Sequence, residues 1–317
     1  MKIVFHSAYW GYRGTEVALY DYAHYAEKLL GAESVILVAR EKASQGGAVG
    51  ERFRRRFRVL EYNTWTEAET LLEQEKTDLL YTIKNGFFDG VAPARTKTAV
   101  HAIFPESDFH GDRYAYLSSW LARTMIGRPE PWVPFMVDLP EPDTDLRAAL
   151  KIPSSALVLG RHGGADSFDI HFAKEEVLRA VAHRQDLWFL FLGTEPFALP
   201  PETERIVFLP PTVDPAQKSA FLRACDGMIH ARERGETFGL AVAEFAWLGK
   251  PVITWEKSHE SFHLEALWEG HPRYRDASSL RKIFNRFEKP PGALPSLYRE
   301  ICEPKFAMER FRRYFLE

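Results

Sequence analysis

Two acidic residues in one turn–helix segment carry the strongest chemical signal of the sequence. Glu236 closes a polar turn that follows an apolar run, and Glu244 lies eight residues later in an apolar helix. If both were helical they would lie about 12 Å apart, whereas the carboxyl groups of glycoside hydrolases lie about 5–9.5 Å apart. The two acids therefore fit separate ends of one long ligand, although Glu236 could also be a first-turn acid that favours the helix dipole. N–H groups at the start of this helix are suited to a phosphate or a sugar hydroxyl. The residues there are Thr237, Phe238, Gly239 and Leu240.

Two further turns have residues that suit an anion. The turn at 160–164 follows an apolar run and contains Arg161, whose guanidinium binds phosphate oxygens in a fork. In the turn at 9–16, Gly14 lets the backbone approach a ligand beside a helix N-terminus. That turn lacks the full G-x-G-x-x-G pattern, which argues against a dinucleotide site. The alternatives are a surface arginine in a flexible loop and a plain turn in which Thr15 caps the helix.

Two other motifs resemble metal sites. His259, Glu260 and His263 form the H-E-x-x-H pattern of zinc peptidases. The pattern follows a strand end instead of lying inside a long apolar helix, and Ala266 stands where the extended motif has glycine. The acidic pair at 143–145 lies in a proline-rich stretch and is interpreted as a solvated linker. We therefore expect no bound metal.

The segment 51–58 concentrates five arginines and two phenylalanines. Such a run is most often a solvated helix face or loop. The alternative is docking to anionic lipid or to an acidic acceptor, because arginines with interleaved rings suit that surface. The second hypothesis predicts peripheral membrane contact through Arg52–Arg58.

Apolar runs alternate with helical periods along the chain, and this pattern is typical of βα units and a parallel sheet. It predicts the strands and helices that must position these residues. Strands are predicted over 3–7, 34–39, 59–62, 78–83, 98–104 and 114–118, then over 156–160, 187–192, 206–209, 227–231 and 251–255. Helices are predicted over 15–30, 66–76, 119–125, 174–183, 215–224, 238–248, 278–287 and 296–316. Thr66 and Glu69 form a capping-box pattern, and Asp214 with Pro215 forms a helix start. Prolines crowd into 127–153, so the domain junction is predicted there. Ligands of such sheets bind at the carboxyl ends of the strands.

Length and composition agree with two ordinary α/β domains. The chain has 317 residues, and 41 Lys+Arg against 44 Asp+Glu give 41 − 44 = −3, which argues against nucleic acid as a partner. Cys225 and Cys302 indicate no disulfide framework. No apolar run is long enough to span a membrane, and the first residues turn polar too early for a signal peptide. We expect a cytoplasmic protein, peripheral to a membrane if the arginine segment binds lipid.

The segment Gly-Glu-Thr-Phe-Gly-Leu at 235–240, with Glu244, resembles the Glu-x7-Glu motif of retaining GT-B glycosyltransferases, especially glycosyltransferase family 4. Other segments agree in order: 14–16 resembles the N-terminal Gly-Gly-x-Glu loop of the family, and 133–138 resembles its Val-Pro-Asn-Gly-Val-Asp junction. Gly160-Arg161 falls where the family has its diphosphate arginine, and 249–253 matches the strand entry after the motif helix.

This resemblance implies an α/β protein with the GT-B fold. Two Rossmann-like domains would face each other across a cleft, the first at 1–135 and the second at 136–295, and the C-terminal helix at about 296–317 would cross back to the first domain. The implied activity is retaining, metal-independent and cofactor-free transfer of a sugar from a nucleoside-diphosphate sugar to a glycan, lipid or small-molecule hydroxyl. UDP- or GDP-linked donors are expected rather than ADP-linked ones.

The resemblance also implies a role for each site residue. Glu236 would lie beside the donor sugar, Glu244 would bind the ribose, and Arg161 would neutralise the diphosphate. His101 matches the region of a family histidine that points at the donor sugar, although a buried structural histidine is the alternative. Gly14, Thr15 and the amides of 237–240 would hold phosphate or sugar. The nucleobase would meet the backbone of Pro210, Pro211 and Thr212.

The chain departs from the family at one charged position. A lysine that usually follows the diphosphate arginine by about five residues is absent, because 166–168 reads Asp-Ser-Phe. Arg232, Arg234 or His162 is then expected to supply the second phosphate charge. Two other classes of function stay open. One is a GT-B-fold sugar-nucleotide epimerase or phosphorylase, and the other is a non-catalytic sugar-nucleotide binding module.

Overall fold

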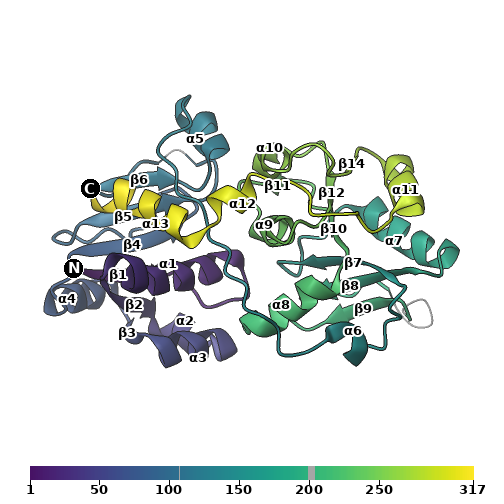
Figure 1. The fold of residues 1–317 in the computed structure, drawn as a ribbon. Coiled ribbons are helices and arrows are strands. Elements are labelled where there is room, and N and C mark those ends of the chain that lie inside the picture. Colours follow the sequence, from purple (N-terminus) through teal and green to yellow (C-terminus); the bar gives the residue numbers. More distant parts are fainter. Residues whose placement is uncertain (107, 199–203) are drawn as a thin grey trace. The chain divides into compact units, whose positions relative to one another are not determined.

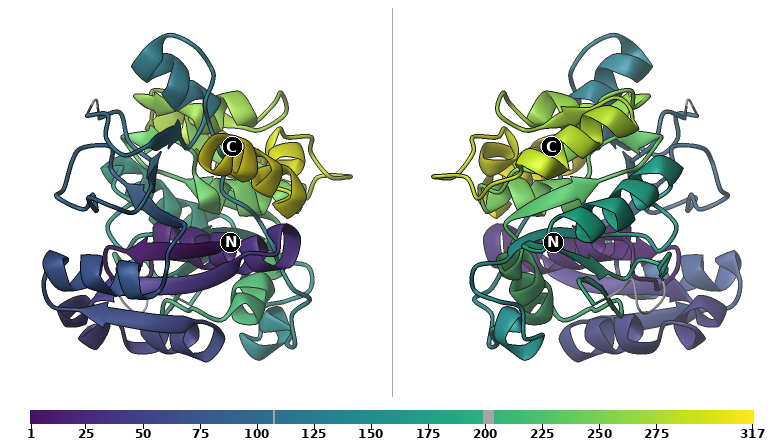
Figure 2. Two further views of the ribbon diagram at one scale, coloured as in Figure 1. Left: turned by 90° about the vertical axis from the view of Figure 1, so that its left-hand side faces the viewer. Right: turned by 90° about the vertical axis from the view of Figure 1, so that its right-hand side faces the viewer.

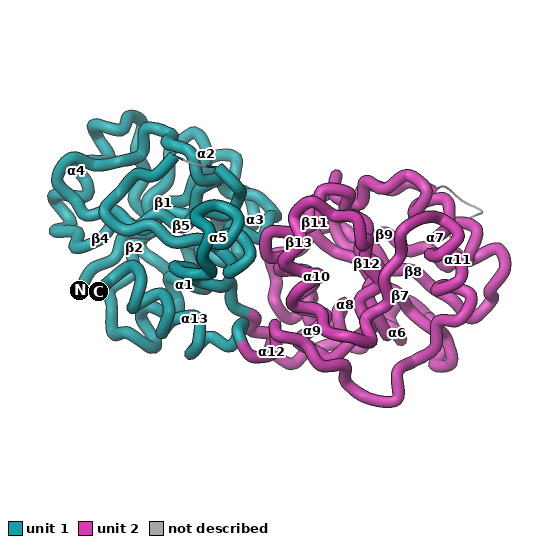
Figure 3. Tube along the Cα trace, turned by 90° about the horizontal axis from the view of Figure 1, so that it is seen from above, with its two compact units in different colours: residues 1–136, 301–317 teal, residues 137–300 magenta. Residues whose placement is uncertain are grey.

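The computed structural model describes residues 1–106, 108–198 and 204–317. The chain forms two compact units, each drawn in its own colour in Figure 3. Unit 1 comprises residues 1–136 and 301–317, and unit 2 comprises residues 137–300. Among the described residues, no helix is long and apolar enough to cross a membrane.

Unit 1 is built on a six-stranded parallel sheet with strand order β3-β2-β1-β4-β5-β6 (Figure 1). Its central strands are almost wholly buried, because helices cover both faces of such a sheet. The strands are β1 (Lys2–Ser7), β2 (Glu33–Ala39), β3 (Arg58–Tyr62), β4 (Leu79–Lys84), β5 (Thr98–Ala102) and β6 (Arg113–Tyr116). All six were predicted, with ends that differ by one or two residues.

The helices of unit 1 include two that the prediction lacked. These are α2 (Arg40–Ser44) and α3 (Gly47–Arg56), which are short and rich in charge. The other helices are α1 (Gly14–Leu30), α4 (Trp65–Gln74) and α5 (Ser119–Ile126). The capping-box prediction for α4 was wrong: Thr64, not Thr66, is the N-cap, and its hydroxyl oxygen accepts from the N–H of Glu67.

The C-terminal segment completes the core of unit 1. Helix α13 (Pro304–Phe311) packs against α1, and the π-helical turn η1 (Arg312–Leu316) packs against β6 (Figures 1 and 2). Phe311 lies with its ring centroid 5.0 Å from that of Tyr81 and 5.3 Å from that of Tyr22. The single helix predicted over 296–316 is divided here, because Pro304 starts a new helix at its first turn. The short helix α12 (Tyr298–Ile301) precedes it.

Unit 2 repeats the architecture with strand order β14-β12-β10-β7-β8-β9, again with parallel pairing. The strands are β7 (Leu157–His162), β8 (Leu187–Leu192), β9 (Ile206–Leu209), β10 (Gly227–His230), β12 (Val252–Trp255) and β14 (Arg273–Tyr274). Strands β11 (Gly235–Glu236) and β13 (Glu260–Ser261) form a separate parallel pair. The three two-residue strands were not predicted, because so short a segment has no periodicity to read.

Unit 2 contains the four predicted helices and two short ones, at 146–149 and 262–266, that the prediction lacked. They are α6 (Leu146–Ala149), α7 (His171–His183), α8 (Pro215–Ala224), α9 (Leu240–Trp247), α10 (Phe262–Ala266) and α11 (Ala277–Arg286). The predicted helix start at Asp214-Pro215 is confirmed, since the Asp214 carboxylate accepts from the N–H of Ala216. The core between α7, α11 and the sheet is rich in aromatic rings, with Phe189, Phe191 and Phe284 fully buried. The predicted class, α/β with two Rossmann-like halves, is confirmed in each unit.

Candidate functional site

The carboxyl ends of the unit 2 strands bring together the charged residues that the sequence singled out. Arg161 lies in β7, His230 ends β10, and Glu236 lies in β11 just after it. The charges of Glu236 and Arg232 both act on the pKa of Arg161, so the three form one electrostatic cluster. This edge of a parallel sheet is where ligands of such folds bind.

Arg161 is a buried cation whose hydrogen bonds go to neutral oxygens. Its side chain donates to the Thr194 hydroxyl, to the Gly164 carbonyl at 2.8 Å and to Ser167 Oγ at 2.5 Å. The residue is 3% exposed, and burial lowers its pKa to about 10, so it stays charged at neutral pH. Within the described part of the chain no carboxylate forms an ion pair with it. The charges of Glu236, Asp169 and Asp166 favour this cation without contacting it. A buried charge without a contacting counter-ion is costly, and an anionic ligand would supply that contact.

Glu236 is an anion held by its own turn and by the neighbouring strand. Its Oε2 lies 2.7 Å from Arg232 Nη1, and its Oε1 lies 3.4 Å from His230 Nε2. Burial alone would raise the pKa of Glu236, but the hydrogen bond from His230 and the positive charge of Arg232 lower it to about 2. The carboxylate is still 19% exposed and can therefore meet a ligand.

Glycines fix the backbone on both sides of Glu236. Gly235 has φ of 82°, and a Cβ there would lie 2.1 Å from the Glu260 carbonyl oxygen, so only glycine lets β11 pair with β13. Gly239 also has φ of 82° and is the N-cap of α9, where it offers no side-chain oxygen. The first-turn N–H groups of α9 are therefore not capped by an N-cap side chain. Thr237 and Phe238 are buried in this turn.

His263, the second histidine of the H-E-x-x-H pattern, is buried beside His230 and close enough to Glu236 for that carboxylate to act on its pKa. Its ring centroid is 4.9 Å from that of His230, and neither ring nitrogen has a hydrogen-bond partner among the described residues. No group of three or more His, Cys, Asp or Glu side chains in residues 1–106, 108–198 and 204–317 is placed to hold a metal ion. Glu260 of the pattern forms an ion pair with Arg234, whose Nη2 lies 2.6 Å from Glu260 Oε1.

Acidification is expected to destabilise the protein through His263. Burial lowers its pKa from 6.5 to about 3 in the folded chain, so at pH 5 the unfolded chain binds a proton that the folded chain does not. The stability is full above pH 6.5 and is lost as the pH falls below it. One pK unit corresponds to about 1.4 kcal/mol, which gives a loss of about 2 kcal/mol between pH 7 and pH 5.

Denaturant unfolding at pH 7 and pH 5 measures this loss. The variant His263→Leu is expected to show a pH dependence of the unfolding free energy that is smaller than that of the wild type by about 2 kcal/mol. An identical pH dependence in both proteins would show that His263 does not stay neutral in the folded chain.

Glu244 is the centre of a second buried charge cluster. Lys218 Nζ from α8 donates to Glu244 Oε1, and His162 Nε2 lies 2.8 Å from Glu244 Oε2. Burial would raise the pKa of Glu244, but the positive charge of Lys218 and the contact with His162 lower it to about 2. Since His162 directly follows Arg161 in β7, this cluster adjoins the buried arginine.

Lys218 is the functional candidate that sequence reasoning missed. It lies 57 positions after Arg161 and 26 before Glu244, on a predicted helix to which no site residue was assigned. Its one local signal is its position. It lies one turn after the Asp214-Pro215 helix start, at the end of α8 that adjoins the predicted nucleobase loop.

The residues predicted to supply the second phosphate charge are already paired. Arg232 contacts Glu236, Arg234 contacts Glu260, and His162 contacts Glu244. In this respect the three differ from Arg161, which is a buried charge that no carboxylate contacts.

The predicted nucleobase loop lies just beyond β9. Its residues Pro210, Pro211 and Thr212 are exposed or partly exposed. Thr212 Oγ1 donates to Gln217 Oε1 at 2.9 Å and accepts from the N–H of Asp214 at 3.1 Å, which fixes the loop to the start of α8. Gly193 at the end of β8 brings the backbone close to Pro211, because a Cβ there would lie 3.2 Å from Pro211 Cβ.

The other predicted site residues, Gly14, Thr15 and His101, lie in unit 1. Gly14 begins α1, whose N-cap is Arg13, so the alternative with Thr15 as the cap is wrong. Thr15 Oγ1 instead donates to Glu16 Oε2 at 2.9 Å. Burial raises the pKa of Glu16 to about 7, so the charge of this side chain changes around neutral pH.

His101 is buried in the core of unit 1. It is 0% exposed, its Nδ1 lies 2.7 Å from the Tyr81 hydroxyl oxygen, and its Nε2 lies 2.9 Å from the Val133 carbonyl oxygen. Burial lowers its pKa to about 3. Both ring nitrogens therefore have hydrogen-bond partners within unit 1, which agrees with the alternative of a buried structural histidine.

Four of the five arginines at 52–58 form ion pairs within unit 1. Arg54 pairs with Glu61 at 2.8 Å and Arg56 with Glu27 at 2.5 Å. The others also have partners: Arg55 contacts Glu51, Arg58 contacts Glu75, and Arg52 lies over the ring of Tyr20. The positive charge that would attract an anionic surface is thus largely compensated.

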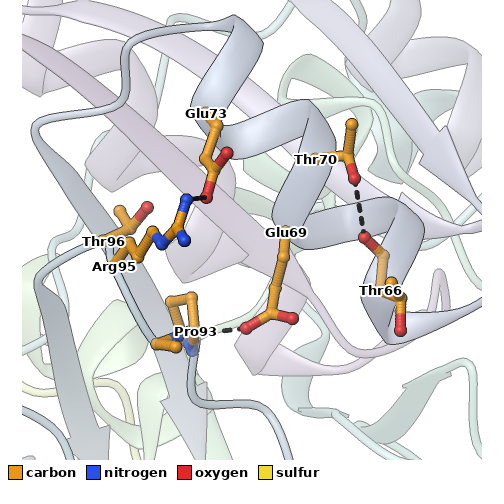
Figure 4. A pocket seen from close by; sticks show the side chains of 8 residues that line it. Thr66, Glu69, Thr70, Glu73, Pro93, Arg95 and Thr96 are labelled. Atoms are coloured by element: carbon orange, nitrogen blue, oxygen red, sulfur yellow. Dashed lines mark hydrogen bonds and ion pairs between the residues drawn. The ribbon is translucent and has the colours of Figure 1, made fainter.

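A surface cavity of about 340 Å³ in unit 1 does not coincide with any of these residues. It lies between α4 and the segment before β5 (Figure 4). Its polar groups bind one another, since Arg95 Nη1 lies 3.2 Å from Glu73 Oε1 and the N–H of Ala94 donates to Glu69 Oε1 at 3.0 Å. This cavity is not a candidate for the chemistry predicted above.

Comparison with solved structures identifies the fold. HepE from Anabaena, solved in complex with UDP-glucose, has a TM-score of 0.68 and 16% identity, over 98% of this chain and 95% of that chain. AviGT4, a glycosyltransferase involved in avilamycin A biosynthesis, has a TM-score of 0.65 and 15% identity, over 100% and 97%. UDP-GlcNAc 2-epimerase from Neisseria meningitidis, bound to UDP-GlcNAc, has a TM-score of 0.63 and 11% identity, over 99% and 100%.

These likenesses extend over the whole chain and show that it has the GT-B fold, as predicted. No family model and no curated protein sequence matches the chain. The fold is shared by glycosyltransferases and by sugar-nucleotide epimerases, so the function must be argued from the site.

Proposed function

We propose that the chain is a glycosyltransferase that uses a nucleoside-diphosphate sugar, with UDP as the nucleotide. The observation that carries the proposal is the buried Arg161, whose guanidinium binds only neutral oxygens among the described residues and lies at the carboxyl end of β7. A diphosphate satisfies such a cation through charge-assisted hydrogen bonds. The choice of UDP is supported by two GT-B neighbours that were solved with UDP-glucose or UDP-GlcNAc.

The donor would be held along the strand ends of unit 2. Arg161 would neutralise the diphosphate, and Glu236 would contact the hydroxyls of the donor sugar. Glu244 would accept hydrogen bonds from the ribose, the first turn of α9 would bind phosphate or sugar, and the loop at 210–212 would meet the base. No step of this scheme needs a metal ion, because the protein's own cation stabilises the leaving group.

We infer that Lys218 supplies the second phosphate charge in place of the absent family lysine. Like His162 it is paired with Glu244, but its ammonium has three donors and this bond uses one of them. Its ammonium is bound to Glu244, and Glu244 also contacts His162, the neighbour of Arg161 in β7. Ribose hydroxyls that donate to Glu244 would share its carboxylate with Lys218 and leave the ammonium directed toward the phosphates.

The proposed reaction retains the configuration of the transferred sugar. The bond between the anomeric carbon and the phosphate oxygen breaks, and the acceptor oxygen bonds to the same face of that carbon. The proton of the acceptor hydroxyl passes to the departing phosphate oxygen. Arg161 would stabilise the charge on that phosphate, and Glu236 would stabilise the positive charge that develops on the sugar.

A sugar-nucleotide epimerase is the second candidate, because an epimerase is among the neighbours with this fold. Product analysis separates the two. A transferase releases UDP only as an acceptor is glycosylated, whereas an epimerase returns an epimeric UDP-sugar without an acceptor. NMR of the product anomeric carbon tests retention.

A thermal-shift panel of UDP, GDP and ADP, with and without EDTA, tests the nucleotide site. UDP at about 100 times its Kd is expected to stabilise the protein by about 2.7 kcal/mol, independently of EDTA. Binding without turnover of any UDP-sugar would favour a binding module. No shift with any nucleotide would contradict the proposal, and a fall in melting temperature with EDTA alone would instead indicate a metal site at His259 and His263.

A further inference from the structure

Exposed aromatic side chains gather at one edge of unit 1. Among the described residues, Tyr9 and Tyr12 follow β1, Phe87 and Phe88 follow β4, and Phe109 lies in the segment between β5 and β6. Strands β1, β4 and β5 are neighbours in the sheet, so the residues directly after β1 and β4 lie at its carboxyl edge. Phe109 lies in the segment that leads from β5 back to the start of β6. Phe87, Phe88 and Phe109 are 47%, 50% and 58% exposed, which is unusual for three phenylalanines in neighbouring segments.

A buried lysine fixes the two segments that carry these rings. Lys84 ends β4, and its side chain is 2% exposed. Its ammonium donates to the Asp89 carboxylate, to the Val91 carbonyl at 2.9 Å and to His110 Nε2 at 3.1 Å. All three donors of the ammonium are used. The segment after β4 and the segment before β6 are therefore held to one point.

Further hydrogen bonds hold the same two segments to each other. The N–H of Phe88 donates to Asp108 Oδ2 at 2.8 Å, and the Tyr114 hydroxyl donates to the Gly86 carbonyl at 3.0 Å. The His110 ring lies 5.4 Å from that of Phe88, and the Tyr114 ring lies 5.0 Å from that of Phe109. The exposed rings are thus presented by a fixed scaffold. We name Phe87, Phe88 and Phe109 the aromatic platform.

The charges around the platform decide what it can bind. Asp89, Asp108 and Glu106 lie in the same two segments, and the cation closest to them in the hydrogen-bond network, Lys84, is buried and fully bonded. Arg95 and Lys97 lie at the β5 end of the first segment, where Arg95 pairs with Glu73. A net negative rim repels phosphate headgroups, which require basic residues. A pyranose ring presents C–H groups that pack on the negative face of an aromatic ring, and its hydroxyls donate to carboxylates.

We propose that the aromatic platform binds a neutral saccharide, and that the acceptor of the proposed reaction is therefore a glycan. The identity of the acceptor rests on the proposed function, but saccharide binding to unit 1 does not. An anionic lipid surface is the competing occupant, and the rim charges disfavour it.

Isothermal titration with neutral oligosaccharides, in the presence of UDP, tests this inference. The panel is cellohexaose, maltohexaose, xylohexaose and chitohexaose, with vesicles of phosphatidylcholine and phosphatidylglycerol as the lipid arm. The variant Phe87→Ser/Phe88→Ser/Phe109→Ser changes exposed side chains only. Trp268→Ser is the matched control, because Trp268 is an aromatic of unit 2 that is 42% exposed.

We expect at least one oligosaccharide to bind the wild type and Trp268→Ser equally, and to bind the triple variant at least 10-fold more weakly. Equal binding by the triple variant, vesicle binding that the triple variant loses, or no binding of any oligosaccharide to the wild type would each overturn the inference. The thermal shift with UDP is expected to be the same in all three proteins. If none of the proteins showed this shift, the proposed nucleotide site would be contradicted. The saccharide result would still stand, because it does not depend on that site.

Discussion

The variant Glu236→Gln is expected to turn over UDP-sugar about 100- to 1,000-fold more slowly than the wild type, with little change in KM for the donor. Glutamine keeps the size of the side chain and can still accept from Arg232, which lies 2.7 Å from the carboxylate. It removes the negative charge that would stabilise the cationic sugar in the transition state. The measurement is steady-state release of UDP in the presence of an acceptor glycan.

A nearby glutamate provides the control for this experiment. Glu233 lies in the same turn but is exposed, and its backbone N–H, not its carboxylate, binds Asp169. Glu233→Gln is expected to retain the turnover of the wild type. If both variants lost activity equally, or if Glu236→Gln kept full activity, Glu236 would not be the residue beside the reacting carbon.

The variant Arg161→Met is expected to bind UDP about 10- to 100-fold more weakly, because each hydrogen bond from a charged donor contributes about 1.5–3 kcal/mol. Its melting temperature without nucleotide is expected to stay unchanged or to rise. The variant loses hydrogen bonds to neutral oxygens, but it also loses the cost of a buried cation that has no carboxylate partner. Titration calorimetry with UDP measures the affinity, and a thermal scan measures the stability.

Arg275→Met is the matched control, since Arg275 is an exposed arginine of the same unit. Weaker UDP binding by Arg161→Met alone would assign the diphosphate to β7. A large drop in the melting temperature of Arg161→Met, with unchanged UDP affinity, would instead make Arg161 a structural residue.

Local sequence patterns predicted the main strands and helices and, within the site, Arg161 and Glu236. Arg161 and Glu236 each belong to one strand–turn segment, so their place at the sheet edge follows from the alternation of strands and helices. Lys218 contacts Glu244 across 26 residues, and no local pattern encodes that distance. The hydrogen-bond partners of His101 are the Tyr81 hydroxyl and the Val133 carbonyl oxygen, which are distant in sequence, so its burial could not be predicted.

The missed elements have physical reasons as well. Helices α2 and α3 are short and highly charged, and α3 owes its place to packing of Phe53 beneath Trp10, with ring centroids 5.8 Å apart. Such tertiary contacts outweigh intrinsic helix propensity. The α4 cap is Thr64 instead of Thr66, a shift of two residues between two threonines that could each cap the helix.

The place of the last residues in unit 1 has a consequence for biosynthesis. Phe311 and Phe315 complete the aromatic core around Tyr81, with ring centroids 5.0 and 5.4 Å away, yet they are separated from the rest of unit 1 by all of unit 2. Translation delivers the N-terminal part first, and domains generally fold in that order. Here unit 2 can fold on the ribosome while unit 1 waits for the C-terminus to emerge. The first domain to be synthesised is then the last to be finished.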